Sequence, residues 1–158
     1  MNGAHLLHEL IEASAYRLPH HRALTFNDEH VDYGTLADNI SAFAGGLLAL
    51  GLKRAERVAI FLESRPETVI AVFGTATAGG AFVPLNPLLK PEQVAYVLRD
   101  CNVRVLVTSA KRLALLETSL AACGPTSSNP AAPRIRRLRL SAPDCEAPSG
   151  TDDFSTDS

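Results

Sequence analysis

Apolar positions in the first fifty residues recur at helical spacing. A long helix is predicted between Asp32, which stands where an N-cap residue is expected, and Gly51, at the C′ position that favours glycine. Its inward face consists of Leu36, Ile40, Phe43, Leu47 and Leu50. A shorter amphipathic helix is predicted at the N-terminus from Leu6, Leu7, Leu10 and Ile11. Between the two helices, residues 23–26 and 30–32 flank the turn dipeptide Asn27-Asp28 and predict a small hairpin.

Further along, the pattern changes to short continuous apolar runs. The run at 58–62 is typical of strands covered on both faces, as in parallel sheets, and residues 81–85 and 103–107 predict two further strands. Two helices are predicted between them. One begins at Pro66, behind a capping box of Ser64 and Glu67, and carries Val69, Ile70, Val72, Phe73 and Ala76. The other begins at Pro91, with Val94, Val97 and Leu98 facing inward. This alternation implies right-handed crossovers, so we predict an α/β fold with a doubly wound parallel sheet and flanking helices.

Composition divides the 158 residues into three regions. Residues 1–124 hold the apolar patterns and are predicted to form one N-terminal α/β subdomain. Residues 125–140 open as a loop rich in proline and serine and continue into a short basic strand, with arginines at Arg134, Arg136, Arg137 and Arg139. Residues 141–158 are acidic and contain only Phe154 as a large apolar residue, so we predict a disordered tail.

Charge and cysteine content narrow the class of protein. A net charge of −2 argues against nucleic acid and against anionic membrane surfaces as partners. No apolar run approaches the roughly 20 residues that span a bilayer. The first basic residue is Arg17, which does not fit the n-region of a signal peptide. Cys101, Cys123 and Cys145 are widely spaced and odd in number, which favours reduced thiols and a cytoplasmic protein.

One pair of glycines has a spacing that also occurs in phosphate-binding loops. Gly74 and Gly79 have the spacing of its two glycines, but Gly80 and Ala81 occupy the positions of the lysine and the Ser/Thr. The pair also lies in a predicted helix that precedes a strand, which reverses the required order. We therefore interpret Gly74 as a helix-packing residue and Gly79 as part of a helix C-cap.

Other candidate residues for chemistry are explained more simply by structure. His5 and His8 share a helix without a third ligand, and we place them on its solvated face, opposite Leu6 and Leu10. His20 and His21 are interpreted as surface residues. The carboxylates Asp28, Glu29 and Asp32 fit turn formation and capping, and Ser14, Ser41, Ser64 and Ser109 fit helix or cap positions. The basic strand lacks the interleaved aromatic residues of an RNA-binding surface. We predict no catalytic, cofactor-binding or metal-binding residue in this chain.

A series of short motifs between residues 26 and 108 resembles the opening of AMP-forming acyl-CoA ligases, in the adenylate-forming superfamily. The motifs occur in that family's order: Asp32-Tyr33-Gly34-x-Leu36, Gly51-Leu52, Arg57-Val58-Ala59-Ile60, Pro66-Glu67, Ala78-Gly79-Gly80-Ala81-Phe82-Val83-Pro84-Leu85-Asn86-Pro87 and Gln93-Val94-x-Tyr96-x-Leu98-x-Asp100. Asn86, where many relatives that adenylate amino acids carry Asp, favours the acyl-CoA ligases. The resemblance implies the partial N-terminal subdomain of the adenylate-forming fold.

The resemblance also implies a reaction. A carboxylic acid, such as a fatty acid, reacts with ATP and Mg²⁺ to give an acyl-adenylate, which the thiol of coenzyme A attacks. The family's glycine-rich phosphate loop would be expected shortly after a segment like Thr151-Asp152-Asp153, and the sequence ends at Ser158. We therefore expect an N-terminal fragment that binds none of these cofactors and is inactive alone. We also expect self-association through apolar surface of the Pro66 helix.

Two other interpretations stay open at this stage. The chain could be a free-standing, non-catalytic interaction module that reuses this half of the fold. A small nucleotide-binding protein is disfavoured because the phosphate loop is absent.

Overall fold

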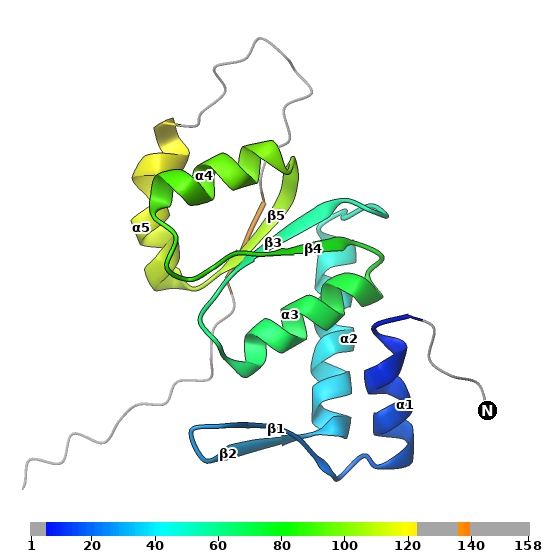
Figure 1. Ribbon diagram of the computed structural model, residues 1–158. Coiled ribbons are helices and arrows are strands. Elements are labelled where there is room, and N and C mark those ends of the chain that lie inside the picture. Colours follow the sequence, from blue (N-terminus) through cyan, green and yellow to red (C-terminus); the bar gives the residue numbers. More distant parts are fainter. Residues whose placement is uncertain (1–5, 123–135, 140–158) are drawn as a thin grey trace, which may run out of the picture.

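The structure, a computed structural model, describes residues 6–122 and 136–139 (Figure 1). Within them, a two-stranded antiparallel hairpin precedes a four-stranded sheet, and helices lie between the strands. The elements in chain order are α1 (Glu9–Arg17), β1 (Arg22–Phe26), β2 (Glu29–Asp32), α2 (Tyr33–Ala49), β3 (Arg57–Phe61), α3 (Pro66–Thr77), β4 (Ala81–Pro84), α4 (Pro91–Asp100), β5 (Val103–Thr108), α5 (Ala110–Ala122) and β6 (Arg136–Arg139).

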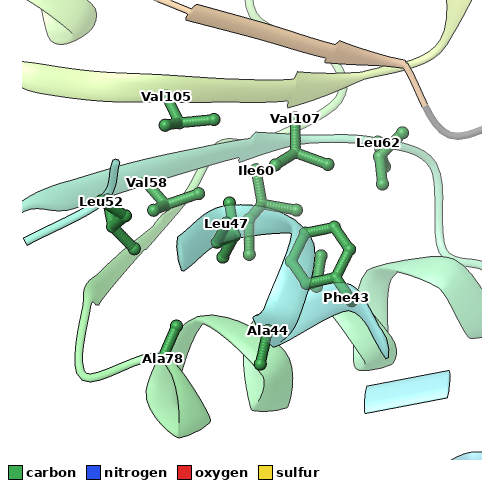
Figure 2. Close-up of a cluster of buried hydrophobic side chains, with 11 residues drawn as sticks. Phe43, Ala44, Leu47, Leu52, Val58, Ile60, Leu62, Ala78, Val105 and Val107 are labelled. Atoms are coloured by element: carbon green, nitrogen blue, oxygen red, sulfur yellow. The ribbon is translucent and has the colours of Figure 1, made fainter. Parts of the chain in front are cut away.

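The larger sheet is parallel, with strand order β4-β3-β5-β6. Alternate residues of β3 point to opposite faces. Val58 and Ile60 pack with residues of α2 and α3, whereas Ala59 and Phe61 pack with residues of α4 and α5. Figure 2 shows the first of these clusters, with Leu47 of α2 lying against the β3 side chains. Because helices cover both faces, the predicted doubly wound α/β fold is confirmed.

The hairpin and the long helix follow the predicted local rules. Asn27 and Asp28 have φ values of 46° and 65°, the left-handed conformation that a two-residue type I′ turn requires at both positions. The Asp32 carboxylate accepts a hydrogen bond from the Thr35 N–H at 2.7 Å and caps α2. Gly51, with φ +80°, follows the helix as its C′ residue. The hairpin, the N-cap and the glycine stop are confirmed.

Helix α3 packs most closely through small residues. Ala71, Gly74 and Thr75 are its buried residues. The larger apolar residues on which we based the helix are only half-buried: Val69, Ile70, Val72, Phe73 and Ala76. The small face brings the helix close to α2, so that Phe43 lies directly over Gly74. The bulky side chains are therefore left at the margins of the contact.

The predicted capping box at the start of α3 is wrong. The N-cap residue is Arg65 rather than Ser64, and it makes no side-chain cap hydrogen bond. Glu67 instead forms an ion pair with Arg65, at 3.4 Å between Oε2 and Nε. The ion pair with a neighbouring guanidinium thus replaces the bond to a backbone N–H. Pro66 does occupy the first turn, as predicted.

Helix α1 is also oriented differently from the prediction. It begins at Glu9, and its neighbour is α2 (Figure 1). Leu6 and Leu10 are exposed, whereas the half-buried face consists of His8, Ile11, Ser14 and Ala15. Small side chains permit a closer approach to α2 than leucines would. The interpretation that placed His8 on the solvated face was therefore wrong.

The last part of the sheet adds two findings. The basic strand predicted in residues 125–140 is confirmed as β6, which pairs in parallel with β5. The strand predicted at 81–85 is confirmed as β4, an edge strand within the described sheet with three of its four residues exposed. Helix α5 was not predicted. The division at residues 124 and 140 stays a prediction, and the acidic tail lies outside the described residues.

Candidate functional site

The carboxyl ends of β3, β4 and β5 meet at one edge of the parallel sheet. Ligands of open α/β sheets bind outside this edge, because the loops that follow the strands converge there. The segments concerned are residues 62–65 after β3, residues 85–90 after β4, and Ser109 after β5. This edge is the candidate functional site of the described chain.

Arg112 of α5 joins two of these segments. Its Nε donates to Glu63 Oε1 at 2.7 Å, and its Nη1 donates to the Pro87 carbonyl at 2.8 Å. The guanidinium also lies 4.6 Å from the centroid of the Phe61 ring, within the range of a cation–π contact. The Arg112 side chain is 15% exposed. A nearly buried cation thus connects the end of β3 to the turn after β4.

Two hydroxyl groups complete the edge. Thr108 is buried, and its Oγ1 donates to the Phe61 carbonyl at 3.0 Å, which links the ends of β5 and β3. Ser109 Oγ accepts from the Arg112 N–H at 3.3 Å at the start of α5. The interpretation of Ser109 as a cap residue is therefore confirmed.

The charge of Glu63 depends on this arrangement. Burial raises the pKa of the Glu63 carboxyl. The hydrogen bonds from its own backbone N–H and from Arg112, together with the charges of Arg112 and Arg65, outweigh that effect. The pKa of Glu63 therefore lies below its ordinary value of 4.5.

Replacing Glu63 with glutamine is expected to reduce the loss of stability in acid. The ionised carboxylate stabilises the fold fully above pH 4.5, and this contribution is lost as the pH falls through the lowered folded-state pKa. The effect is small because the side chain is 44% exposed and solvent screens the charge. Urea unfolding of both proteins from neutral to acid pH measures it. Equal losses of unfolding free energy in the two proteins would contradict the linkage.

Apart from this edge, a hollow of about 330 Å³ lies between the hairpin and the start of α3. Its lining residues come from β1 and from the segment that opens α3: Leu24, Thr25, Phe26, Ser64, Arg65, Pro66, Thr68 and Val69. The charge of Arg65 is compensated by Glu67. No histidine or carboxylate stands beside Ser64 among these lining residues, and the hydroxyl of Thr25 lies 3.1 Å from Nδ1 of His30 in the hairpin.

The other candidates from the sequence lie apart from both places. Gly74 is buried inside α3, and Gly79 follows the helix with φ +75°, which confirms their structural interpretation. His20 and His21 are exposed, as predicted. The Thr35 N–H lowers the pKa of Asp32, consistent with its capping role. The Ser14 hydroxyl donates to the Leu10 carbonyl within the first helix.

The described part of the chain contains no cluster of metal-ligating side chains. Across residues 6–122 and 136–139, no three His, Cys, Asp or Glu side chains gather where they could hold a metal ion. Cys101 is a free, half-buried thiol, while His5, Cys123 and Cys145 lie outside the described residues. In the same part of the chain, no helix has the length and apolar character that crossing a membrane requires. That the chain contains no catalytic, cofactor-binding or metal-binding residue stays a prediction.

Comparison with known proteins gives consistent matches. The family model described as AMP-binding enzyme matches residues 11–153. Tyrocidine synthase 3 of Brevibacillus parabrevis is 36% identical over 110 residues, which is 70% of this chain and 2% of that protein. Malpinin synthetase of Mortierella alpina is 29% identical over 140 residues, 84% of this chain and 2% of that protein. The chain therefore spans only a small part of these curated relatives.

Solved structures match over most of the described fold. The anthranilate CoA ligase AuaEII, in complex with anthranoyl-AMP, superposes with a TM-score of 0.74 at 24% identity, over 87% of this chain and 26% of that one. The N-terminal subdomain of NpsA from Klebsiella oxytoca, in complex with 3-hydroxyanthranilyl-AMSN, gives a TM-score of 0.62 at 27% identity. That match covers 65% of this chain and 26% of the other.

Proposed function

Because this chain belongs to the AMP-binding enzyme family, we propose that it forms the N-terminal layer of an enzyme that activates a carboxylic acid with ATP. The match of the family model over residues 11–153 carries the proposal. The resemblance seen in the sequence motifs is thereby confirmed at the level of the family and its N-terminal portion. In this reaction the carboxylate attacks the α-phosphorus of ATP and pyrophosphate leaves.

We further propose that coenzyme A is the thiol acceptor of the activated acyl group. Asn86 supports this assignment, and CoA ligases such as AuaEII are among the structural neighbours. The curated relatives include peptide synthetases such as tyrocidine synthase 3, so the comparisons with known proteins do not single out coenzyme A as the acceptor. The acid, ATP, Mg²⁺ and coenzyme A are substrates and cofactors of the whole enzyme in this proposal, and the cytoplasm is its proposed compartment.

We propose that the described residues form no nucleotide site of their own. Gly74, the first glycine of the phosphate-loop spacing, is covered by Phe43 and lies inside a helix, so backbone N–H groups there cannot cradle a phosphate. No described carboxylate cluster is available for Mg²⁺. The role we propose for this part of the chain is to provide a rigid sheet edge, with Arg112 joining the loops after β3 and β4.

The isolated chain is expected to bind Mg-ATP only weakly. With no phosphate loop in the described residues, the N–H groups and positive charge that hold a triphosphate are missing. Calorimetric titration measures the affinity. A dissociation constant of about 1 μM, which corresponds to roughly −8 kcal/mol, would contradict the expectation.

A chimera tests the proposed function directly. Residues 6–122 would replace the matching segment of AuaEII, and anthranilate-dependent exchange of pyrophosphate into ATP would be measured. The chimera should exchange pyrophosphate and residues 1–158 alone should not. Exchange by the isolated chain would reveal a site in it. A folded but inactive chimera, beside active AuaEII, would favour the interaction module.

The thiol acceptor needs a separate test. An enzyme of the length of AuaEII that contains this chain as its N-terminal part should convert coenzyme A to acyl-CoA when acid, ATP and Mg²⁺ are present. Loading of a phosphopantetheine carrier protein without acyl-CoA formation would replace coenzyme A in the proposal and leave the activation step intact.

A further inference from the structure

The turn after β4 is held in one conformation although its tip lies in solvent. Asn86 Oδ1 accepts a hydrogen bond from the Leu88 N–H at 2.9 Å, and the Asn86 carbonyl accepts from the Leu89 N–H at 3.1 Å. Arg112 fixes the residue between them through the Pro87 carbonyl. Leu88 is nevertheless 88% exposed. The turn is therefore held by these polar bonds together with the half-buried Leu89, which packs against the core, while its tip at Leu88 has no packing of its own.

Arg112 is the long-range member of that set of bonds. The Asn86 bonds connect neighbouring residues, but Arg112 reaches Pro87 from another element and Glu63 from across 49 residues of sequence. Helix α5 has separate anchors in Leu113 and Leu116, which are both buried. The hydrogen bonds of the Arg112 side chain go to the two loops rather than into the core.

We propose that Arg112 is a positioning residue for the activation reaction. It keeps the turn formed by residues 86–89 at a fixed place beside the end of β3, so that the carboxyl edge is ordered before a ligand arrives. Such preorganisation removes an ordering cost from binding. The proposal rests on the proposed function, since the edge matters for catalysis only if the reaction occurs there. Because protein groups already occupy its Nε and Nη1, Arg112 affects substrate binding more than the chemical step.

The ordering effect is measurable in the chain as it stands. In Arg112→Gln, the backbone order parameters of Leu88 and Leu89 should fall from about 0.85 to below about 0.6 by ¹⁵N relaxation, while those of β3 and β5 stay high. Arg112→Lys retains one cationic donor and should restore part of the order. The matched control is Arg99→Gln, the same change at an exposed position of α4. Unchanged order parameters in Arg112→Gln would overturn the proposal.

The catalytic consequence is measured in the AuaEII chimera. There, Arg112→Gln should raise KM for ATP or for the acid about tenfold, with kcat within about twofold, and Arg112→Lys should recover part of the loss. Arg99→Gln should leave both constants unchanged. An active chimera whose KM does not respond to Arg112→Gln refutes the positioning role. An inactive parent chimera refutes the proposed function, and the order parameters then still decide whether Arg112 orders the turn.

Discussion

Replacing Gly74 with valine is expected to lower the free energy of unfolding by about 3 kcal/mol. A Cβ atom at this position would lie 2.6 Å from Phe43 Cδ1 and 3.1 Å from the Ile40 carbonyl oxygen. The ring could turn away, but the backbone oxygen of α2 cannot, so the two helices must separate. Separation would open the core beneath them, because Phe43 and Ala71 belong to the same cluster. Urea unfolding followed by circular dichroism measures the change.

Gly46→Ala provides the matched control. Gly46 also lies within a helix, but a Cβ atom there would have nothing within 4 Å. Alanine has the higher helix propensity, so this protein should gain up to about 1 kcal/mol. If valine at position 74 left the urea midpoint unchanged, the close contact of α2 and α3 would be wrong.

Replacing Leu47 with alanine is expected to cost about 2–5 kcal/mol. Leu47 is 0% exposed and packs against the β3 face of the sheet (Figure 2). Truncation removes buried methyl groups and leaves a cavity that the backbone of a parallel sheet cannot close. Thermal or urea unfolding of the purified protein measures the loss.

The adjacent residue is the natural comparison. Leu48 is 55% exposed, so Leu48→Ala removes little buried surface and should change stability by no more than about 0.5 kcal/mol. Similar losses for the two substitutions would show that α2 does not present Leu47 to the sheet. Both residues lie in the same turn of one helix, so helix propensity cancels in the comparison.

Local signals were sufficient for much of the fold. Four of the five residues of β3 form a continuous apolar run because both faces of this strand are covered, a pattern typical of parallel sheets between helix layers. Asp32 and Gly51 were predictable because caps depend on residues within one turn of the helix end. The hairpin followed from Asn27-Asp28, two residues that tolerate positive φ.

The errors arose where the choice of partner is not local. Periodicity identified α1 as amphipathic and α3 as apolar on most sides, but it did not show that Leu6 and Leu10 of the N-terminal segment are exposed or that α3 buries only small residues. Strand β4 has an apolar sequence, yet its place at the edge of the described sheet depends on strand order. Arg112 was missed because a single arginine in a helix is typical of the surface. Its partner Glu63 is 49 residues away, and neither residue alone signals the pair.

The strand order also has a consequence for how the chain folds during synthesis. Strand β3 pairs with β4 and β5, and both follow it in the sequence. Phe61 and Thr108, which are joined by a hydrogen bond, are 47 residues apart. At roughly 5–20 residues per second, a ribosome leaves β3 without its second neighbour for several seconds. Strand β3, four of whose five residues are buried in the folded protein, thus stays incompletely paired, and nascent chains of this length should depend on chaperones that shield strand edges until β5 has emerged.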